Sequence, residues 1–452
     1  MQFNERALQN ESFAAPSASP VPIERKGEYL PMRIAAVLCE YNPFHNGHAY
    51  QIAQIRSTLP DAVIIAIMSG NYVQRGEPAI LCKYDRAKAA VLAGVDLVLE
   101  LPFPHCCASA ETFASAGISI AASLGIVDTL AFGAEAEDLP GLQRIAKRLD
   151  SYRYREALAG LCEKNKHSST GFPAQREALY RSLFGDDGIS LLNQPNNILA
   201  IEYLRALQNH HDITPLLIQR YGAPHDHMDT SLSSASASAS QIRAWILDQN
   251  RACIQKTVPD ESLAILDCAH HSGRSPADIK RAEAAILWYF RNTAPHTTSL
   301  YADMPDGMAE RLHHAAIQAD SLEDMLSRCK TKKYTNARLR RSLLYAFFRV
   351  SVVSLSTFPA FTCVLAANIR GTAVLNKIKK RAALPLLTKP AHYKKLSDKV
   401  RSAFELSLSA DIFWHMLLPK PLPASAVFRY SPYIHKKEGN EVPSASSVQA
   451  GF

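Results

Sequence analysis

The sequence predicts an α/β protein with a Rossmann-like parallel sheet, followed by a mainly α-helical C-terminal domain. Between residues 33 and about 136, short apolar runs alternate with stretches whose apolar residues have helical spacing. Such alternation is typical of βαβ units around a parallel sheet. Beyond about residue 260 the pattern is helical.

The expected elements follow one another in a regular order. The apolar runs predicted as strands are residues 34–39, 62–68, 97–101 and 129–132, and the predicted helices are residues 49–57, 84–93 and 110–123. Residues 137–210 are expected to be mainly helical, and residues 216–221 to form one more strand. Ligands of parallel sheets bind beyond the carboxyl ends of strands. The polar segments that follow the strands should therefore line one rim, at residues 40–42, 69–71, 100–102 and 133–135.

Length and composition suggest how the chain is divided. A chain of 452 residues exceeds one typical core and favours two or three domains. The Ser-, Ala- and Pro-rich residues 1–31 are expected to be a disordered extension, and residues 436–452 a disordered tail. Between them we expect an α/β domain at residues 32–250 and a helical domain at residues 251–435.

The composition also indicates the cellular environment. No run approaches the ~20 apolar residues that a membrane helix needs, so we expect a soluble protein without a membrane partner. The nine cysteines are scattered and lack the paired spacing of a structural zinc site. They favour a reducing, cytoplasmic location, and the sequence predicts no metal ligands.

The segment His45-Asn46-Gly47-His48 lies between the first predicted strand and the first predicted helix. A helix N-terminus offers unpaired N–H donors and a positive dipole to an anion. Gly47 lets the backbone approach a ligand, and two imidazoles can donate hydrogen bonds to phosphoryl oxygens in a transition state. Such a site suits attack on the α-phosphate of a nucleoside triphosphate. The alternative is an ordinary polar turn that caps the helix.

Two further segments are candidates for anion binding. Ser238 or Ser240 is expected to cap a helix that carries Arg243 one turn later, which would form a second phosphate-binding helix terminus. The alternating Ser and Ala residues before it also fit a linker. Arg75, on a loop after a strand, could neutralise a carboxylate substrate or pyrophosphate, unless it is only a surface arginine.

Basic residues gather in the second half of the chain. Residues 328–341 hold seven Lys or Arg residues and no acid, interleaved with Tyr334, and a second cluster occupies residues 377–381. Basic side chains with an aromatic ring for stacking form a plausible RNA-binding surface. A solvated helix face without a partner is the alternative.

Residues 39–48, Cys-Glu-Tyr-Asn-Pro-Phe-His-Asn-Gly-His, resemble the opening signature of the bacterial tRNA(Met) cytidine acetate ligases, which have an H-x-G-H nucleotidyltransferase fold. Further matches follow in the family's order, so that the resemblance covers about residues 32–390. They lie at residues 68–79, 83–87, 94–102, 109–114, 132–135, 194–199, 220–223, 238–243, 332–341 and 384–387. The chain departs from the family at Cys82, where an Asp is frequent.

The resemblance implies an enzyme that joins acetate to AMP from ATP with release of pyrophosphate. We expect this enzyme to need Mg²⁺. The acetyl group then passes to N4 of the wobble cytidine (C34) of elongator tRNA(Met). His45 and His48 would be catalytic and would stabilise the pentavalent α-phosphate of the transition state. The resemblance implies tRNA contacts from Lys332, Lys333, Arg338 and Arg341, and the second basic cluster adds Lys379 and Lys380. It implies ATP contacts from Leu38, Cys39, Glu40, Tyr41, Asn42, Pro43, Phe44, His45, Asn46, Gly47, His48, Ala49, Tyr50, Gln51, Gly133, Asn197, Arg220, Ser238, Ser240 and Arg243.

Two other functions remain open at the level of sequence. One is an adenylyltransferase that makes a dinucleotide cofactor, for which the basic helices would have no use. The other is an RNA-binding protein with a vestigial nucleotide site.

Overall fold

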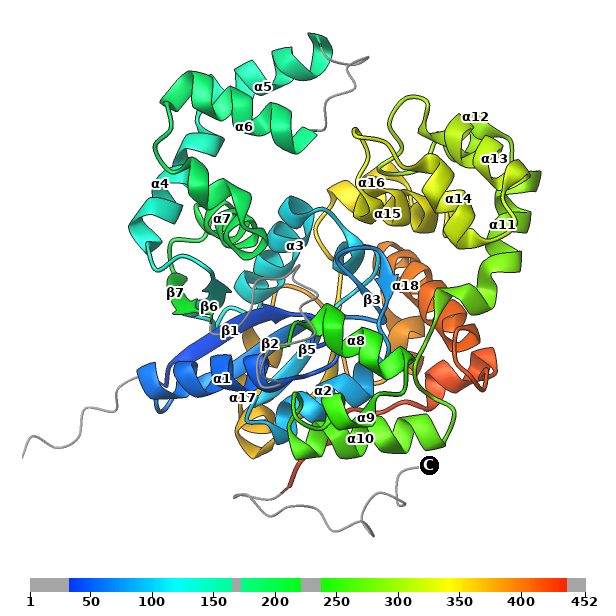
Figure 1. Ribbon diagram of the computed structural model, residues 1–452. Helices are drawn as coiled ribbons and strands as arrows, with labels where there is room; N and C mark the ends of the chain where they lie inside the picture. The colour runs from blue at the N-terminus through cyan, green and yellow to red at the C-terminus, as the bar shows by residue number, and fades with distance from the viewer. Residues whose placement is uncertain (1–31, 165–171, 221–236, 437–452) are drawn as a thin grey trace, which may run out of the picture. The chain divides into compact units, whose positions relative to one another are not determined.

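The computed structural model describes residues 32–164, 172–220 and 237–436. Its centre is a mixed sheet with the strand order β10-β8-β5-β2-β1-β6-β7, in which β9 also pairs with β8 (Figure 1). The strands β5, β2, β1, β6 and β7 are parallel, whereas β8 runs antiparallel to β5. The strands of this sheet are β1 (Ile34–Cys39), β2 (Val63–Ser69), β5 (Leu97–Leu101), β6 (Thr129–Ala134), β7 (Thr214–Gln219), β8 (Thr362–Ala367), β9 (Leu386–Leu387) and β10 (Tyr433–Ile434).

The inner strands are buried along their whole length. Every residue of β1, β2 and β5 is buried, as expected for a parallel sheet that is covered on both faces. The predicted α/β fold and its first four strands are confirmed, with shifts of one or two residues at some ends. The predicted strand at residues 216–221 lies two residues earlier, as β7, and Tyr221 falls outside the described residues.

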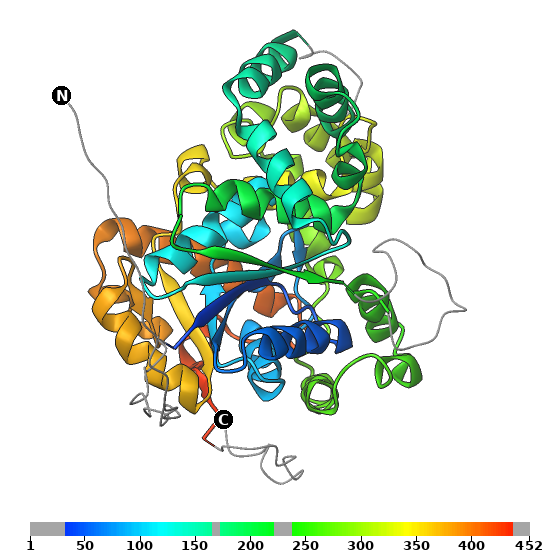
Figure 2. The same cartoon turned by 90° about the vertical axis from the view of Figure 1, so that its left-hand side faces the viewer.

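Helices cover both faces of the sheet (Figure 2). One face carries α1 (Asn46–Thr58) and α2 (Lys83–Leu92), and the other carries α3 (Ala110–Ser123) and α7 (Pro195–Leu207). Gly117 shows how closely α3 packs on β1, because a Cβ at this position would lie 2.2 Å from a methyl carbon of Leu38. The other helices before residue 300 are α4 (Leu139–Asp150), α5 (Tyr152–Lys164), α6 (Phe172–Phe184), α8 (Ala239–Leu247), α9 (Arg251–Ile254), α10 (Asp260–His271), α11 (Glu283–Asn292) and α12 (Pro295–Thr298).

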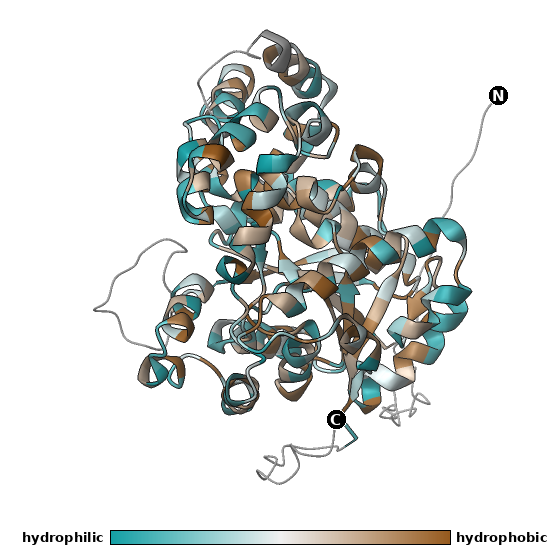
Figure 3. Cartoon of the chain, turned by 90° about the vertical axis from the view of Figure 1, so that its right-hand side faces the viewer, coloured by the Kyte–Doolittle hydropathy of each residue, from teal (hydrophilic) through white to brown (hydrophobic). Residues whose placement is uncertain are grey.

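The later part of the chain forms a helical group and then returns to the sheet. Its helices are α13 (Met308–Gln318), α14 (Leu322–Cys329), α15 (Asn336–Phe347), α16 (Val352–Ser356), α17 (Ile369–Arg381) and α18 (Asp398–Met416). Figure 3 shows hydrophilic segments on the outer helices. Within the described ranges, no helix combines the length and apolar character that crossing a membrane requires.

The expected boundary at residue 250 does not separate the sheet from the helices. β8 and β10 come from residues 251–435, which were expected to be helical, and β8 supplies the neighbour of β5. All six residues of β8 are buried. A short run that is apolar on both sides has no period that distinguishes a strand from a buried helix.

A buried ion cluster ties α18 to the sheet. The ammonium of Lys83 lies 2.7 Å from a carboxylate oxygen of Glu100, in β5, and 2.6 Å from one of Asp411, in α18. The amide of Asn71 donates to the second oxygen of Asp411 at 2.8 Å. Nearby, the indole of Trp414 donates to the carbonyl of Ala79 at 2.8 Å. The C-terminal helix is therefore joined to the sheet by polar contacts that are shielded from water.

Candidate active site

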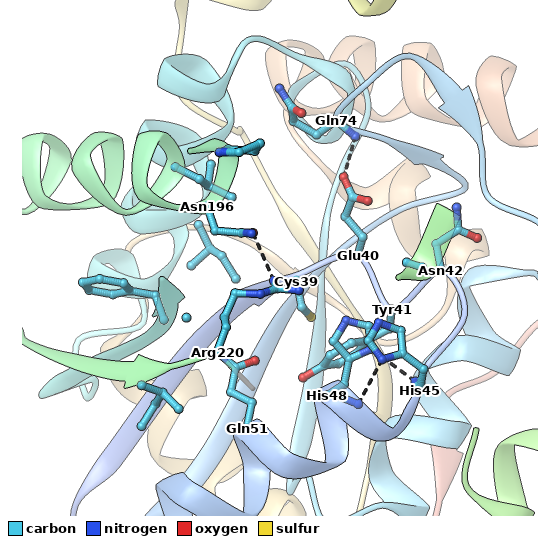
Figure 4. A pocket seen from close by; sticks show the side chains of 18 of the residues that line it. Cys39, Glu40, Tyr41, Asn42, His45, His48, Gln51, Gln74, Asn196 and Arg220 are labelled. Carbon is cyan, nitrogen blue, oxygen red and sulfur yellow. Dashed lines mark hydrogen bonds between the residues drawn. The ribbon is translucent and has the colours of Figure 1, made fainter. Parts of the chain in front are cut away.

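A pocket opens at the carboxyl ends of β1, β6 and β7 (Figure 4). Of the segments predicted to line one rim, residues 40–42 and Gly133 contribute to it, whereas residues 69–71 and 100–102 lie outside its lining. Its walls come from the loop after β1, the start of α1, the ends of β6 and β7, and the starts of α3, α7 and α8. In Figure 4, His45 and His48 lie on one side of the pocket, and Asn196 and Arg220 lie on the opposite side.

The two histidines form a capping box at the start of α1. Nδ1 of His45 accepts a hydrogen bond from the backbone N–H of Gly47 at 3.0 Å, and Nδ1 of His48 accepts one from the backbone N–H of His45 at 3.2 Å. An acceptor nitrogen carries no hydrogen, so each neutral ring carries its hydrogen on Nε2. The rings stack with their centroids 3.8 Å apart. The local fold thus prepares two Nε2–H donors side by side at a helix N-terminus.

Gly47 is required by this arrangement. A Cβ at residue 47 would lie 2.9 Å from Cε1 of His45, which would displace the ring. Tyr41, in the left-handed backbone region with φ of 47°, packs edge-on against both Phe44 and His48 with centroid distances of 4.8 Å. These aromatic contacts fix the ring of His48 from behind.

A buried arginine holds the ends of β1 and β2. Arg86, in α2, is fully buried and donates hydrogen bonds to the carbonyl oxygens of Glu40, Ser69, Gly70 and Leu81. Four carbonyl acceptors compensate the cost of burying one guanidinium. Sequence reasoning assigned no role to Arg86, because a single arginine in a helix carries no signal of burial.

The opposite wall is held by a reciprocal clamp. The Glu135 carboxylate accepts hydrogen bonds from the backbone N–H groups of Asn196 and Asn197, and the side-chain oxygen of Asn197 accepts from those of Glu135 and Ala136. Asn197 is fully buried and does not line the pocket, whereas Asn196 does. The oxygen of the Asn196 amide in turn accepts from Arg220 at 3.0 Å.

α8 begins as the sequence predicts. The hydroxyl of Ser238 accepts from the backbone N–H of Gln241 at 3.2 Å and is the N-cap. Arg243 donates to the hydroxyl of Ser240 and to the carbonyl of Asn42, both at 3.1 Å. Ser240 and Arg243 therefore face the loop after β1, and both line the pocket.

A two-stranded hairpin, β3 (Tyr72–Val73) and β4 (Glu77–Pro78), brings Gln74 and Arg75 to the pocket. The backbone N–H of Gln74 donates to the carboxylate of Glu40 at 2.9 Å. Desolvation raises the pKa of the Glu40 carboxyl, and the hydrogen bond from Gln74 opposes this shift. The predicted loop arginine is therefore part of the pocket wall.

Most of the predicted nucleotide contacts gather in this pocket. The predicted residues that line it are Leu38, Cys39, Glu40, Tyr41, Asn42, His45, Gly47, His48, Tyr50, Gln51, Arg75, Gly133, Arg220, Ser240 and Arg243. Those outside its lining are Pro43, Phe44, Asn46, Ala49, Asn197 and Ser238. Asn46 instead donates to the carbonyl oxygens of Lys256 and Thr257. Alternate residues of a loop and of a helix turn point to different sides, so a contiguous motif includes residues that face away.

The sequence did not indicate the apolar part of the pocket. Residues that it missed are Gln74, Ala110, Phe113, Phe132, Pro195, Asn196, Leu199, Tyr203, Ile218, Gln219 and Ala239. The apolar members lie on helices and strands whose patterns also fit an ordinary core. Only their positions at strand ends and helix starts could have marked them.

The two basic clusters do not form one surface. Lys332 is exposed, but Arg338 pairs with Asp303 at 2.9 Å, and Arg341 is buried with the same carboxylate 3.5 Å away. Lys379 and Lys380 are exposed on α17. Just after α17, the backbone N–H of Ala383 donates to the carbonyl of Ser123. Ser123 is the last residue of α3, and the chain from there leads into the start of β6. The α17 cluster thus lies at the amino ends of the parallel strands, whereas the pocket lies at their carboxyl ends.

Comparison with known proteins gives a consistent result. The family model described as HIGH Nucleotidyl Transferase matches residues 32–426. A tRNA(Met) cytidine acetate ligase of Caldanaerobacter subterraneus is 35% identical over 385 residues, which cover 84% of this chain and 94% of that protein. One from Caldicellulosiruptor saccharolyticus is 37% identical over 385 residues, with 84% and 92% covered.

Two solved structures are also similar to this chain. The crystal structure of Thermotoga maritima TmcAL bound with alpha-thio ATP has a TM-score of 0.82 and 28% identity, and the match covers 90% of this chain and all of that one. The apo structure of the same protein has a TM-score of 0.83 over the same shares.

Proposed function

The chain belongs to the HIGH nucleotidyltransferases of the tRNA(Met) cytidine acetate ligase family, and we propose that it uses ATP to acetylate N4 of the wobble cytidine of elongator tRNA(Met). The observation that carries this proposal is the pair of Nε2–H donors that His45 and His48 hold at the N-terminus of α1. Such donors stabilise charge that develops on a phosphoryl group.

The first proposed step forms an acetyl-adenylate. A carboxylate oxygen of acetate attacks the α-phosphorus of ATP, and the bond from that phosphorus to the bridging oxygen breaks, so that pyrophosphate leaves. Acetate is already ionised at neutral pH, so this step needs no general base. The histidines donate to the α-phosphoryl oxygens, and the arginines that line the pocket, Arg75, Arg220 and Arg243, are placed to neutralise substrate charge.

The second proposed step transfers the acetyl group. The exocyclic amine of cytidine attacks the carbonyl carbon, AMP leaves with the bonding electrons, and the amine loses one proton. The base must leave its stack to reach the adenylate. The exposed Lys332 and its neighbour Lys333 are candidates to bind the tRNA backbone. Lys379 and Lys380, at the amino ends of the parallel strands, would need to bind a different part of the tRNA.

We expect Mg²⁺ to enter with the triphosphate. Among residues 32–164, 172–220 and 237–436, no group of three or more His, Cys, Asp or Glu side chains could form a metal cage. Mg²⁺ is commonly held by substrate phosphates, waters and one or two carboxylates. Glu40 supplies a carboxylate to the pocket wall, and the ion would neutralise charge on the leaving pyrophosphate.

An exchange assay tests the first step. With ATP, acetate and labelled pyrophosphate but no tRNA, the wild-type protein should return label to ATP, and omission of acetate should abolish the exchange. His48→Ala should reduce exchange by about 100-fold or more, since it removes a transition-state donor. Undiminished exchange in this variant would contradict the catalytic placement of the histidines.

A further inference from the structure

Glu77, in β4, lies between an arginine of the pocket and an arginine of the basic segment. One of its carboxylate oxygens accepts a hydrogen bond from Arg340, in α15, and the other lies 3.6 Å from Arg243, in α8. The three residues line one groove together with Ser240. Ser240 and Arg243 also line the nucleotide pocket, so this groove and the pocket share a wall.

The hairpin that carries Glu77 rests directly on α15. Gly76 has a φ of 82°, and a Cβ at this position would lie 2.8 Å from both Cβ of Arg340 and the backbone N of Arg341. The same hairpin presents Gln74 and Arg75 to the pocket. A shift of α15 would therefore reach the pocket wall through backbone packing as well as through charge.

One carboxylate serves two guanidinium groups with unequal contacts. The bond to Arg340 is direct, whereas Arg243 is farther from Glu77 and has two other acceptors, the Asn42 carbonyl and the Ser240 hydroxyl. A phosphate in the pocket attracts Arg243 away from Glu77, so that Glu77 pairs with Arg340 alone. A phosphate of RNA that binds Arg340 draws it away from Glu77, so that Glu77 pairs with Arg243 instead. The two anions therefore compete through Glu77, and such coupling is reciprocal.

We propose that Glu77 is a positioning residue that couples the nucleotide site to α15 through Arg243 and Arg340, so that bound tRNA weakens the hold on the nucleotide phosphates. The coupling to tRNA rests on the proposed function. The link between Glu77 and Arg243 does not rest on it, because this link changes the affinity for ATP in the absence of tRNA. A weaker hold on phosphates after tRNA binds would favour departure of pyrophosphate before acetyl transfer.

Binding of ATP without acetate tests the link in its first arm. Glu77→Gln should bind ATP about two- to threefold more tightly than wild type, because Arg243 is no longer drawn to a carboxylate. Arg340→Gln should bind ATP more weakly by a similar factor, because Glu77 then pairs with Arg243 alone. The side chains of Glu77, Arg243 and Arg340 are 29%, 19% and 38% exposed, so solvent screening keeps these effects small. Calorimetric titration measures both constants.

Glu323→Gln is the matched control. Glu323 lines a neighbouring groove whose lining does not include Arg243, and it pairs with Lys280 at 2.8 Å. This variant makes the same charge change and should leave ATP affinity within error of wild type. Equal affinities for ATP in the Glu77→Gln, Arg340→Gln and wild-type proteins, or a shift of the same sign in both variants, would overturn the inference.

The second arm adds unmodified elongator tRNA(Met), whose retention is measured separately by filter binding. Saturating tRNA should raise the dissociation constant of ATP about two- to threefold in wild type and leave it unchanged in Glu77→Gln. A tRNA effect that persists in Glu77→Gln would contradict the coupling. Failure of the wild-type protein to retain tRNA would contradict the proposed function. The opposite changes in ATP affinity of Glu77→Gln and Arg340→Gln, measured without tRNA, would still decide the role of Glu77.

Discussion

At the scale of single residues, the main result is that the fold fixes the protonated nitrogen of two histidines. Because the capping box uses Nδ1 of both His45 and His48 as acceptors, structure and chemistry need the same tautomer. The backbone of α1 thus stabilises the form of each ring that donates from Nε2. The residues that cap α1 are thus the same residues that we propose to bind the α-phosphate.

The pair of variants His45→Asn and His45→Ala separates these two roles. Asn is a good N-cap, so His45→Asn should keep the unfolding free energy within about 0.5 kcal/mol of wild type, whereas His45→Ala should lose about 1 kcal/mol. Both variants lack the Nε2 donor and should lose pyrophosphate exchange by about 100-fold or more. Urea unfolding and the exchange assay measure the two effects. Full activity of His45→Asn would show that the imidazole acts only as a cap.

Arg86 should be a stability residue. Arg86→Lys cannot reach four carbonyl oxygens at once, and each unsatisfied buried acceptor costs about 1–3 kcal/mol. We expect a loss of at least about 3 kcal/mol in the free energy of unfolding by urea. Arg144→Lys is the control, because Arg144 is 47% exposed and its replacement should change stability by about 0.5 kcal/mol or less. Equal effects of the two changes would refute the stabilising role of the four hydrogen bonds that Arg86 donates.

At the scale of elements, the hairpin β3–β4 joins the pocket to the helical group. Gly76→Ala tests this packing, with Gly307→Ala as its control. Both glycines have positive φ, 82° and 77°, but a Cβ at residue 307 meets no atom within 4 Å. Gly307→Ala should cost about 1–2 kcal/mol from backbone strain alone, and Gly76→Ala about 1–3 kcal/mol more from steric overlap. If both variants lose the same stability in urea, the hairpin does not press on α15.

The elements that sequence could and could not predict differ in a physical way. β1, β2, β5 and β6 alternate with helices along the chain, so local pattern and fold agree. β8 follows a helical stretch, pairs with β5 more than 260 residues earlier and is buried on both faces, so no local signal marks it. The same holds within the site: His45 and Arg243 stand in motifs, but Phe113 and Tyr203 line the pocket only because tertiary packing turns them inward.

At the scale of the whole molecule, the C-terminal part completes the sheet. β8 pairs with β5, and the Lys83 ammonium is shared between Glu100 and Asp411. A fragment of residues 32–250 would expose the edge of β5 and leave Lys83 and Glu100 without Asp411. We expect this fragment to be insoluble or to lack cooperative thermal unfolding by circular dichroism. A soluble fragment that unfolds cooperatively and binds ATP would show that the first 250 residues form an independent domain.

The same architecture brings together the pocket in which we propose that ATP is activated and the basic residues 328–341 that we propose to bind the acceptor. The pocket at the strand ends, the hairpin and α15 follow one another in space, so a tRNA bound by residues 328–341, as we propose, would lie next to the proposed site of ATP activation. Incubation with ATP, labelled acetate and total tRNA, followed by nucleoside analysis, tests this account most directly. We predict label in N4-acetylcytidine from elongator tRNA(Met), in amounts equal to the AMP and pyrophosphate released. Pyrophosphate release without any labelled nucleoside would contradict the account.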